Sequence, residues 1–123
     1  MFQGLFGNAT EVNAKELQKD LEATIIQGET VVKAFRIVRD LFIFTDKRLL
    51  LIDKQGISGK KAEYHSIPYQ SISHFSVETA GTFDMDAEMK IYIYGNPTPI
   101  RREFKRGTDL IGVQKVLAQF IVK

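Results

Sequence analysis

The sequence predicts a mainly β, α+β fold in which seven antiparallel strands form two sheets of a partly open barrel. Short segments rich in β-branched and aromatic residues follow one another between positions 29 and 106, separated by polar or glycine- and proline-containing turns. Apolar residues recur at helical spacing before and after this region. Short strands with tight turns favour antiparallel connections, so we expect one helix to cap the barrel and an additional helix to precede it.

Length and composition indicate an ordinary globular chain. Its 123 residues fit a single domain, which we divide into an N-terminal segment and helix (1–28), seven strands (29–106) and a capping helix (108–122). The absence of cysteine excludes disulfides and thiol catalysis. The net charge of +2 does not favour nucleic-acid binding, and no apolar run approaches the ~20 residues that span a bilayer. We therefore expect a cytoplasmic protein.

Both ends of the chain carry amphipathic patterns. We expect the first helix near residues 9–25, capped by Asn8 or Thr10. Before it, Phe2, Leu5 and Phe6 indicate a short docking segment, because a free tail would not keep three large apolar groups. Thr108 is the expected N-cap of the final helix. Its apolar stripe comprises Leu110, Val113, Leu117, Phe120 and Ile121.

The hairpin at residues 41–53 is apolar at consecutive positions on both arms, around a turn centred on Asp46 and Lys47. Successive side chains of a strand point to opposite faces, so both faces of this hairpin need cover. Either the first helix or a neighbouring copy of the chain could supply the second cover, and we favour the copy. The oligomer interface predicted on this basis comprises Phe42, Phe44, Leu50 and Ile52, with Arg48 on its rim.

Residues 83–94 show the clearest alternation in the sequence, which predicts a strand with one dry and one wet face. Tyrosines are favoured at interfaces, so we predict that the wet face binds a partner protein. That face comprises Asp84, Asp86, Glu88, Lys90, Tyr92 and Tyr94.

The residue types that carry chemistry do not form a recognisable catalytic, cofactor or metal motif. Asp84, Asp86 and Glu88 lack the glycine and final glutamate of a calcium loop. His65 follows Tyr64 and precedes Ser66, and His74 follows Ser73, but sequence neighbours on a regular strand point to opposite faces. We therefore expect no Ser–His pair, no enzyme activity, and neither a cofactor nor a metal ion.

Local motifs resemble the bacterial pleckstrin-homology (PH) family across nearly the whole chain. They are Phe42-x-Phe44-Thr45-Asp46-Lys47-Arg48-Leu49-x-Leu51-x-Asp53, residues 63–69 (EYHSIPY) and residues 75–84 (FSVETAGTFD). The resemblance implies a PH-like barrel of seven strands in two sheets and a protein of unassigned activity. It also implies a cyclic homo-oligomeric ring and a role in protein–protein contact.

The basic residues depart from the pattern of membrane-binding eukaryotic PH domains. Lys33, Arg36 and Arg39 lie on or just after the first strand, but residues 41–44 of the second strand are entirely apolar. We therefore do not expect phosphoinositide binding.

Two functions remain open from the sequence. The first is a non-enzymatic, self-assembling scaffold in which the acidic first helix of one copy meets the basic final strand of the next. The alternative is a peripheral membrane-binding module whose basic patches recognise anionic lipid.

Overall fold

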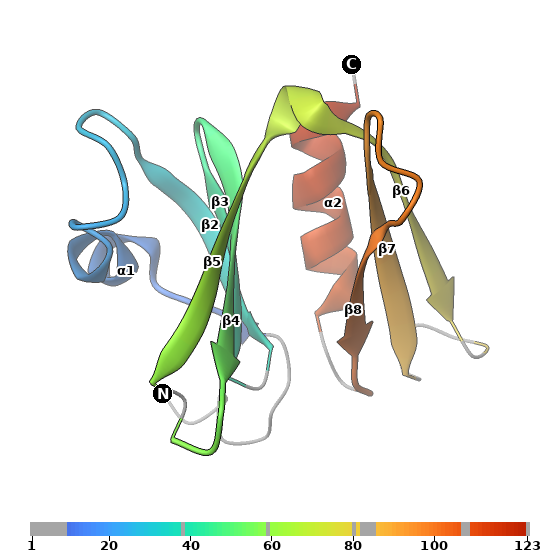
Figure 1. Ribbon diagram of the computed structural model, residues 1–123, viewed down its shortest axis with the longest axis horizontal. Helices are drawn as coiled ribbons and strands as arrows, with labels where there is room; N and C mark the ends of the chain where they lie inside the picture. Colours follow the sequence, from blue (N-terminus) through green and yellow to red (C-terminus); the bar gives the residue numbers. More distant parts are fainter. Residues whose placement is uncertain are drawn as a thin grey trace.

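The computed structural model describes residues 10–37, 39–58, 60–79, 81, 86–106 and 109–122. Eight antiparallel strands in this part of the chain form two sheets (Figure 1). The larger sheet has the order β1-β2-β3-β4-β5, and the smaller sheet has the order β6-β7-β8. The seven predicted strands correspond to β2 through β8, and the two-residue β1 is an addition that the sequence did not reveal.

The elements of the larger sheet follow the predicted order. Their bounds are β1 Thr10–Glu11, α1 Ala14–Asp20, β2 Val31–Ile37, β3 Asp40–Thr45, β4 Arg48–Gln55 and β5 Lys61–Pro68. The β3–β4 hairpin pairs Phe44 with Leu49 and Leu41 with Ile52. Asp46 and Lys47 form its tip as expected, because the Thr45 hydroxyl accepts the backbone N–H of Lys47 at 3.1 Å and thereby closes the turn.

A short 3-10 turn, η2 (Tyr69–Ser71), leads from the larger sheet into the smaller one. The remaining elements are β6 Ile72–Thr79, β7 Ala87–Ile93, β8 Ile100–Phe104 and α2 Leu110–Ile121. Figure 1 shows α2 between the two sheets and α1 on the outer side of the larger sheet. No helix in these described elements is long and apolar enough to cross a membrane.

Two hydrophobic clusters explain the alternation of apolar and polar residues along β7 and the apolar residues on both faces of the β3–β4 hairpin. The main cluster lies between the sheets and α2, where Phe42 of β3 meets Phe104 of β8 edge to face at 5.6 Å between ring centroids. The second cluster lies between the outer face of the larger sheet and α1. The inward residues of β7 that alternate with polar ones, Ala87, Met89 and Ile91, are all buried in the main cluster.

The first helix is shorter than predicted. The expectation of a helix over 9–25, capped by Asn8 or Thr10, is wrong. Thr10 of β1 pairs with Arg36 of β2. Asn13 caps α1, because its side-chain oxygen accepts the backbone N–H of Glu16 at 3.1 Å. The apolar spacing was nevertheless informative, because its residues all contribute to the second cluster. They are Val12, Leu17, Leu21 and Ile25.

At the final helix the N-cap is Asp109 and not Thr108, which lies outside the described residues. The Asp109 carboxylate accepts the N–H of Gly112 at 3.0 Å. It thereby satisfies one of the free donors at the start of α2. Four of the helix residues, Leu110, Val113, Val116 and Leu117, are buried against the main cluster.

Candidate interaction surfaces

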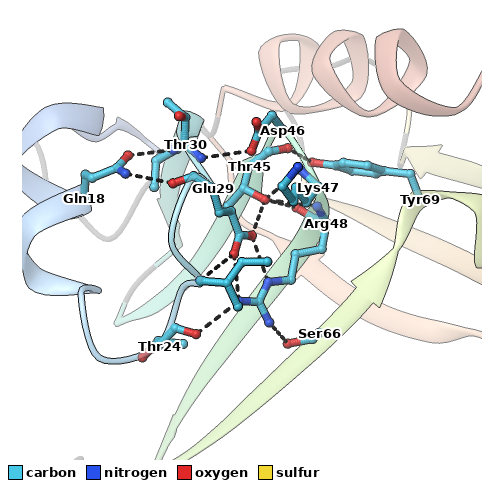
Figure 2. A network of polar contacts seen from close by, with 12 residues as sticks. Gln18, Thr24, Glu29, Thr30, Thr45, Asp46, Lys47, Arg48, Ser66 and Tyr69 are labelled. Atoms are coloured by element: carbon cyan, nitrogen blue, oxygen red, sulfur yellow. Dashed lines mark hydrogen bonds and ion pairs between the residues drawn. The ribbon is translucent and has the colours of Figure 1, made fainter.

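The Glu29 carboxylate is the centre of a polar network beneath the tip of the β3–β4 hairpin (Figure 2). Its Oε2 accepts the Nε–H of Arg48 at 2.9 Å and the hydroxyl of Thr45 at 2.6 Å. Its Oε1 accepts Nη2–H of Arg48 at 2.9 Å and the backbone N–H of Ile26 at 3.1 Å. Gly28, with φ of 88°, makes the turn that delivers Glu29 to this position.

Arg48 extends the network to two further segments. Its Nη1 donates to the Ser66 hydroxyl on β5 at 2.8 Å, and its Nη2 donates to the carbonyl of Thr24 at 3.1 Å. The guanidinium therefore joins the α1–β2 connection, β4 and β5. Arg48, the predicted rim residue of a subunit interface, therefore makes its hydrogen bonds within the chain.

Burial by itself raises the pKa of the Glu29 carboxyl, but the surrounding donors outweigh it. Hydrogen bonds from Arg48, Thr45 and the Ile26 N–H, together with the positive charge of Arg48, lower the pKa from 4.5 to about 2. Glu29 is therefore an anion that stays inside the network, and its role is to hold the α1–β2 connection on the hairpin. A proton-transfer role would require a pKa near neutrality.

Tyr69 completes the polar contacts on the other side of the hairpin tip. Its hydroxyl donates to the carbonyl of Thr45 at 2.6 Å, and its ring stacks on Phe120 of α2 at 4.3 Å. Burial raises the pKa of Tyr69, and the charges of Asp46 and Glu29 raise it further. The tyrosine thus stays neutral and links the hairpin to the capping helix.

The four apolar residues predicted as an oligomer interface are buried within the chain itself. Phe42 and Phe44 belong to the main cluster, and Leu50 and Ile52 belong to the cluster beneath α1, with exposed fractions of 0–2%. The second dry face of the hairpin is covered by α1, which was the alternative to a neighbouring copy. These side chains consequently offer no surface to another subunit, and the interface prediction at these positions is corrected.

The predicted partner-binding face lies on the outer side of the smaller sheet, where β7 is the central strand. Asp86 and Tyr94 are exposed, whereas Glu88, Lys90 and Tyr92 are partly covered by neighbouring strands. Asp84 lies outside the described residues. The Tyr92 ring stacks on His74 of β6 at 4.3 Å, so the face includes a His–Tyr pair that the sequence did not reveal.

Charges on this face are arranged in rows across the strands. Glu88 lies between Glu78 of β6 and Glu103 of β8 in the strand register, and such like-charged neighbours are destabilising. Cations of the adjacent row compensate them: Arg101 contacts Glu88 at 3.2 Å, and Lys90 contacts Glu78 at 3.9 Å. Within the described residues no group of three or more potential ligands could hold a metal ion.

Ser73 and His74 are closer than a regular strand allows. The strand register shifts between Ile72 and His74, and the Ser73 hydroxyl lies 2.9 Å from Nδ1 of His74. The expectation of no Ser–His pair applied to a regular strand, and the irregularity at this position allows the hydrogen bond. The Ser73 hydroxyl also donates to the carbonyl of Tyr92 at 3.2 Å, and no carboxylate is recorded in hydrogen-bond contact with His74 among the described residues. The pair lacks the third group that orients a catalytic histidine.

An open groove of about 620 Å³ runs between β6 and α2, and no pattern in the sequence indicated it. It is lined by Ser73, His74, Phe75, Ser76, Val77, Thr79, Gln114, Ile121 and Val122. The side-chain oxygen of Gln114, one of these residues, is itself buried and has no hydrogen-bond partner among the described residues. Spacing along α2 gave no signal for this groove, because it depends on how the helix lies against the edge of the smaller sheet.

Two antiparallel sheets packed around a C-terminal helix define a pleckstrin-homology-like domain. Solved structures support this class. A pleckstrin-homology domain from Shewanella amazonensis is 52% identical with a TM-score of 0.86, and the match covers 99% of this chain and 98% of that one. A DUF1696 family protein with a pleckstrin-homology domain from Shewanella loihica is 54% identical with a TM-score of 0.80, covering 94% of this chain and 99% of that chain.

The sequence model of the family described as "Bacterial PH domain" matches residues 1–121. The chain therefore belongs to this family. The uncharacterised protein YjqA of Bacillus subtilis is 53% identical over 116 residues, covering 94% of this chain and 93% of YjqA. The uncharacterised protein YozO of the same organism is 30% identical over 118 residues, covering 96% and 97% of the two chains. These descriptions indicate no enzymatic family.

Proposed function

We propose that this bacterial PH domain is a non-enzymatic scaffold that assembles into a cyclic homo-oligomer and presents binding surfaces to an as yet unidentified partner protein. The observation that carries the proposal is the placement of opposite charges. The acidic residues Glu16, Asp20 and Glu22 are exposed on or next to α1, on the outer side of the larger sheet. Arg101, Lys105 and Arg106 are exposed on or next to β8, the edge strand of the other sheet.

Charges on opposite sides of a molecule favour head-to-tail contact over self-complementary pairing. A contact between two different patches is heterologous, and it closes into a ring when its rotation divides a full circle. Electrostatic complementarity would fix the register of such a contact, while apolar and backbone contacts would supply most of the affinity. The outer face of β7, with the exposed Tyr94 that follows this strand, would then remain available to a partner.

Native mass spectrometry at low micromolar concentration tests this assembly. We expect a single closed oligomer for the wild-type chain and a shift towards monomer for Glu16→Lys combined with Glu22→Lys, because the reversed charges repel the basic strand. Glu63→Lys, on the exposed part of β5, is the matched control and should leave the oligomer intact. A wild-type chain that is monomeric at this concentration would contradict the proposal.

A specific feature also favours the alternative of a peripheral membrane module. Ile57 is fully exposed at the turn between β4 and β5. Lys54, Lys60 and Lys61 flank it, and the latter two are exposed. An apolar tip among lysines suits the interface of an anionic membrane, where each lysine near the surface contributes about 1 kcal/mol.

Co-sedimentation with vesicles tests this second candidate. If it holds, binding to vesicles containing phosphatidylserine should exceed binding to neutral phosphatidylcholine vesicles, and raising the salt concentration should weaken it. Ile57→Ser should reduce binding several-fold, since the loss of an apolar anchor of this size costs about 1–2 kcal/mol. Equal or absent sedimentation with both vesicle types would exclude the membrane function.

A further inference from the structure

The outer edge of β6 is a free template for another strand. β6 pairs with β7 on one side only, and among the described residues no strand pairs with its other side. Such edges are commonly protected by proline, lysine or very short length. β6 has eight residues, Ile72–Thr79, with neither proline nor lysine among them. Its bulge lies at the first residues, which leaves the stretch from His74 to Thr79 regular.

The groove beside this edge has a defined chemistry. Its apolar lining includes the partly buried Phe75, Val77 and Ile121, which pack against the main cluster. In the described part of the chain, none of its lining residues is lysine, arginine, aspartate or glutamate. An occupant that suits the groove is an extended, uncharged chain that supplies backbone N–H donors and apolar side chains.

We propose that the occupant is the N-terminal segment, residues 1–9, of a second copy of this chain. Its sequence, MFQGLFGNA, contains no charged side chain. Phe2 and Phe6 are four positions apart, so they would face the same side of an extended chain and could both enter the apolar groove. The segment precedes β1, which belongs to the larger sheet, whereas the groove flanks the smaller one. This inference rests on the proposed self-assembly and names a contact between two neighbouring copies in it.

The lengths of the two partners match. An extended segment of nine residues spans about 30 Å, and eight residues of a strand span about 26 Å. Backbone hydrogen bonds along this length would give affinity, and the two phenylalanines would set the register. The same contact would join the larger sheet of one copy to the smaller sheet of the next, which is again a head-to-tail arrangement.

Fluorescence anisotropy with a labelled peptide of residues 1–9 tests the contact directly. The receptor is the full chain carrying Phe2→Ser and Phe6→Ser, which removes both aromatic side chains from its own segment, and its circular dichroism spectrum should match that of the wild type. We expect saturable binding at micromolar concentrations. Adding Val122→Lys, at a groove position whose side chain is 66% exposed, should weaken binding by about tenfold or more, because it places a charge against the apolar segment.

Matched controls separate docking at the groove from general stickiness. Ile111→Lys introduces the same charge on α2 at a position that is 49% exposed and does not line the groove, so it should leave binding unchanged. A peptide in which Phe2 and Phe6 are serine should not bind. Amide hydrogen exchange should slow within residues 74–79 when the wild-type peptide is added, since these amides would join a new ladder.

The outcomes distinguish this inference from the proposed function. If the wild-type chain is an oligomer but the peptide does not bind, or binds Val122→Lys equally well, the segment is not the contact and the scaffold proposal stands on other surfaces. If the peptide binds but the wild-type chain is monomeric, a second copy as the source of the segment is overturned together with the ring. Peptide binding that requires the groove, together with loss of oligomer in the Phe2→Ser and Phe6→Ser chain, supports the inference.

Discussion

Replacing Arg48 by methionine should lower the free energy of unfolding by about 3–4 kcal/mol. Methionine preserves much of the aliphatic volume, but the Glu29 carboxylate loses its two bonds from the guanidinium. The Glu29 side chain is fully buried, whereas that of Arg48 is 21% exposed, so removing the cation leaves an uncompensated buried anion. Denaturation by urea, followed by circular dichroism, measures the loss.

Two comparisons identify the source of this loss. Lys47→Met removes a neighbouring, exposed cation and should change stability by less than about 0.5 kcal/mol. The double variant Glu29→Gln with Arg48→Met should recover part of the stability, because neither charge then remains buried. If the double variant lost as much unfolding free energy as the sum of the two single variants, Glu29 would not be the partner that Arg48→Met leaves unpaired.

The pH dependence of the variant should differ from that of the wild type. In the wild type the pKa of Glu29 is lowered to about 2, so its contribution is fully present above 4.5 and is lost as pH falls towards 2. Without the Arg48 bonds and charge, burial becomes the dominant influence and raises the pKa above the ordinary value. The stability gap between Arg48→Met and wild type should therefore narrow between about pH 7 and pH 4.

Leu50→Ala should destabilise the chain by about 2–4 kcal/mol, with the same loss at every protein concentration. Leu50 is fully buried in the cluster between the hairpin and α1, and truncation leaves a cavity that the packed neighbours can only partly fill. If a neighbouring copy covered this face instead, the loss of stability relative to the wild type would change with protein concentration and the variant would also lose oligomer. Urea denaturation at two concentrations about twentyfold apart separates the two cases.

The control for Leu50→Ala is Ile26→Ala. Ile26 lies in the connection that follows α1 and its side chain is 59% exposed, so its truncation should cost less than about 0.5 kcal/mol. A loss at Leu50 no larger than that at Ile26 would contradict the internal packing of the hairpin against α1.

Much of the fold could be predicted from local patterns. The alternation in β7 identified its buried side, and Ala87, Met89 and Ile91 lie in the main cluster as expected. The apolar stripe of α2 and the turn at Asp46 and Lys47 were likewise readable, because period and turn chemistry depend on residues close in sequence. The order of the elements and the motifs at residues 42–53, 63–69 and 75–84 resemble the PH family, and the family match confirms that resemblance.

Helix boundaries were less accurate because several caps competed. Asn13 and Thr10 are both good cap residues, and only the pairing of Thr10 in β1 with Arg36 in β2 decided between them. Similarly, the bulge at the start of β6 brought the Ser73 hydroxyl to His74, which regular strand geometry excludes. Pairing between strands that are distant in sequence set both outcomes.

The sequence by itself determined that the β3–β4 hairpin is dry on both faces, but only the tertiary structure decided what covers it. The apolar pattern of the strand predicts that Leu50 and Ile52 are buried. The same pattern does not indicate which element covers them. The placement of α1 beneath the larger sheet supplied that answer, and Glu29, far from Arg48 in sequence, fixed the connection in place. The groove between β6 and α2 has the same origin, because it exists only where a sheet edge and a helix meet in space.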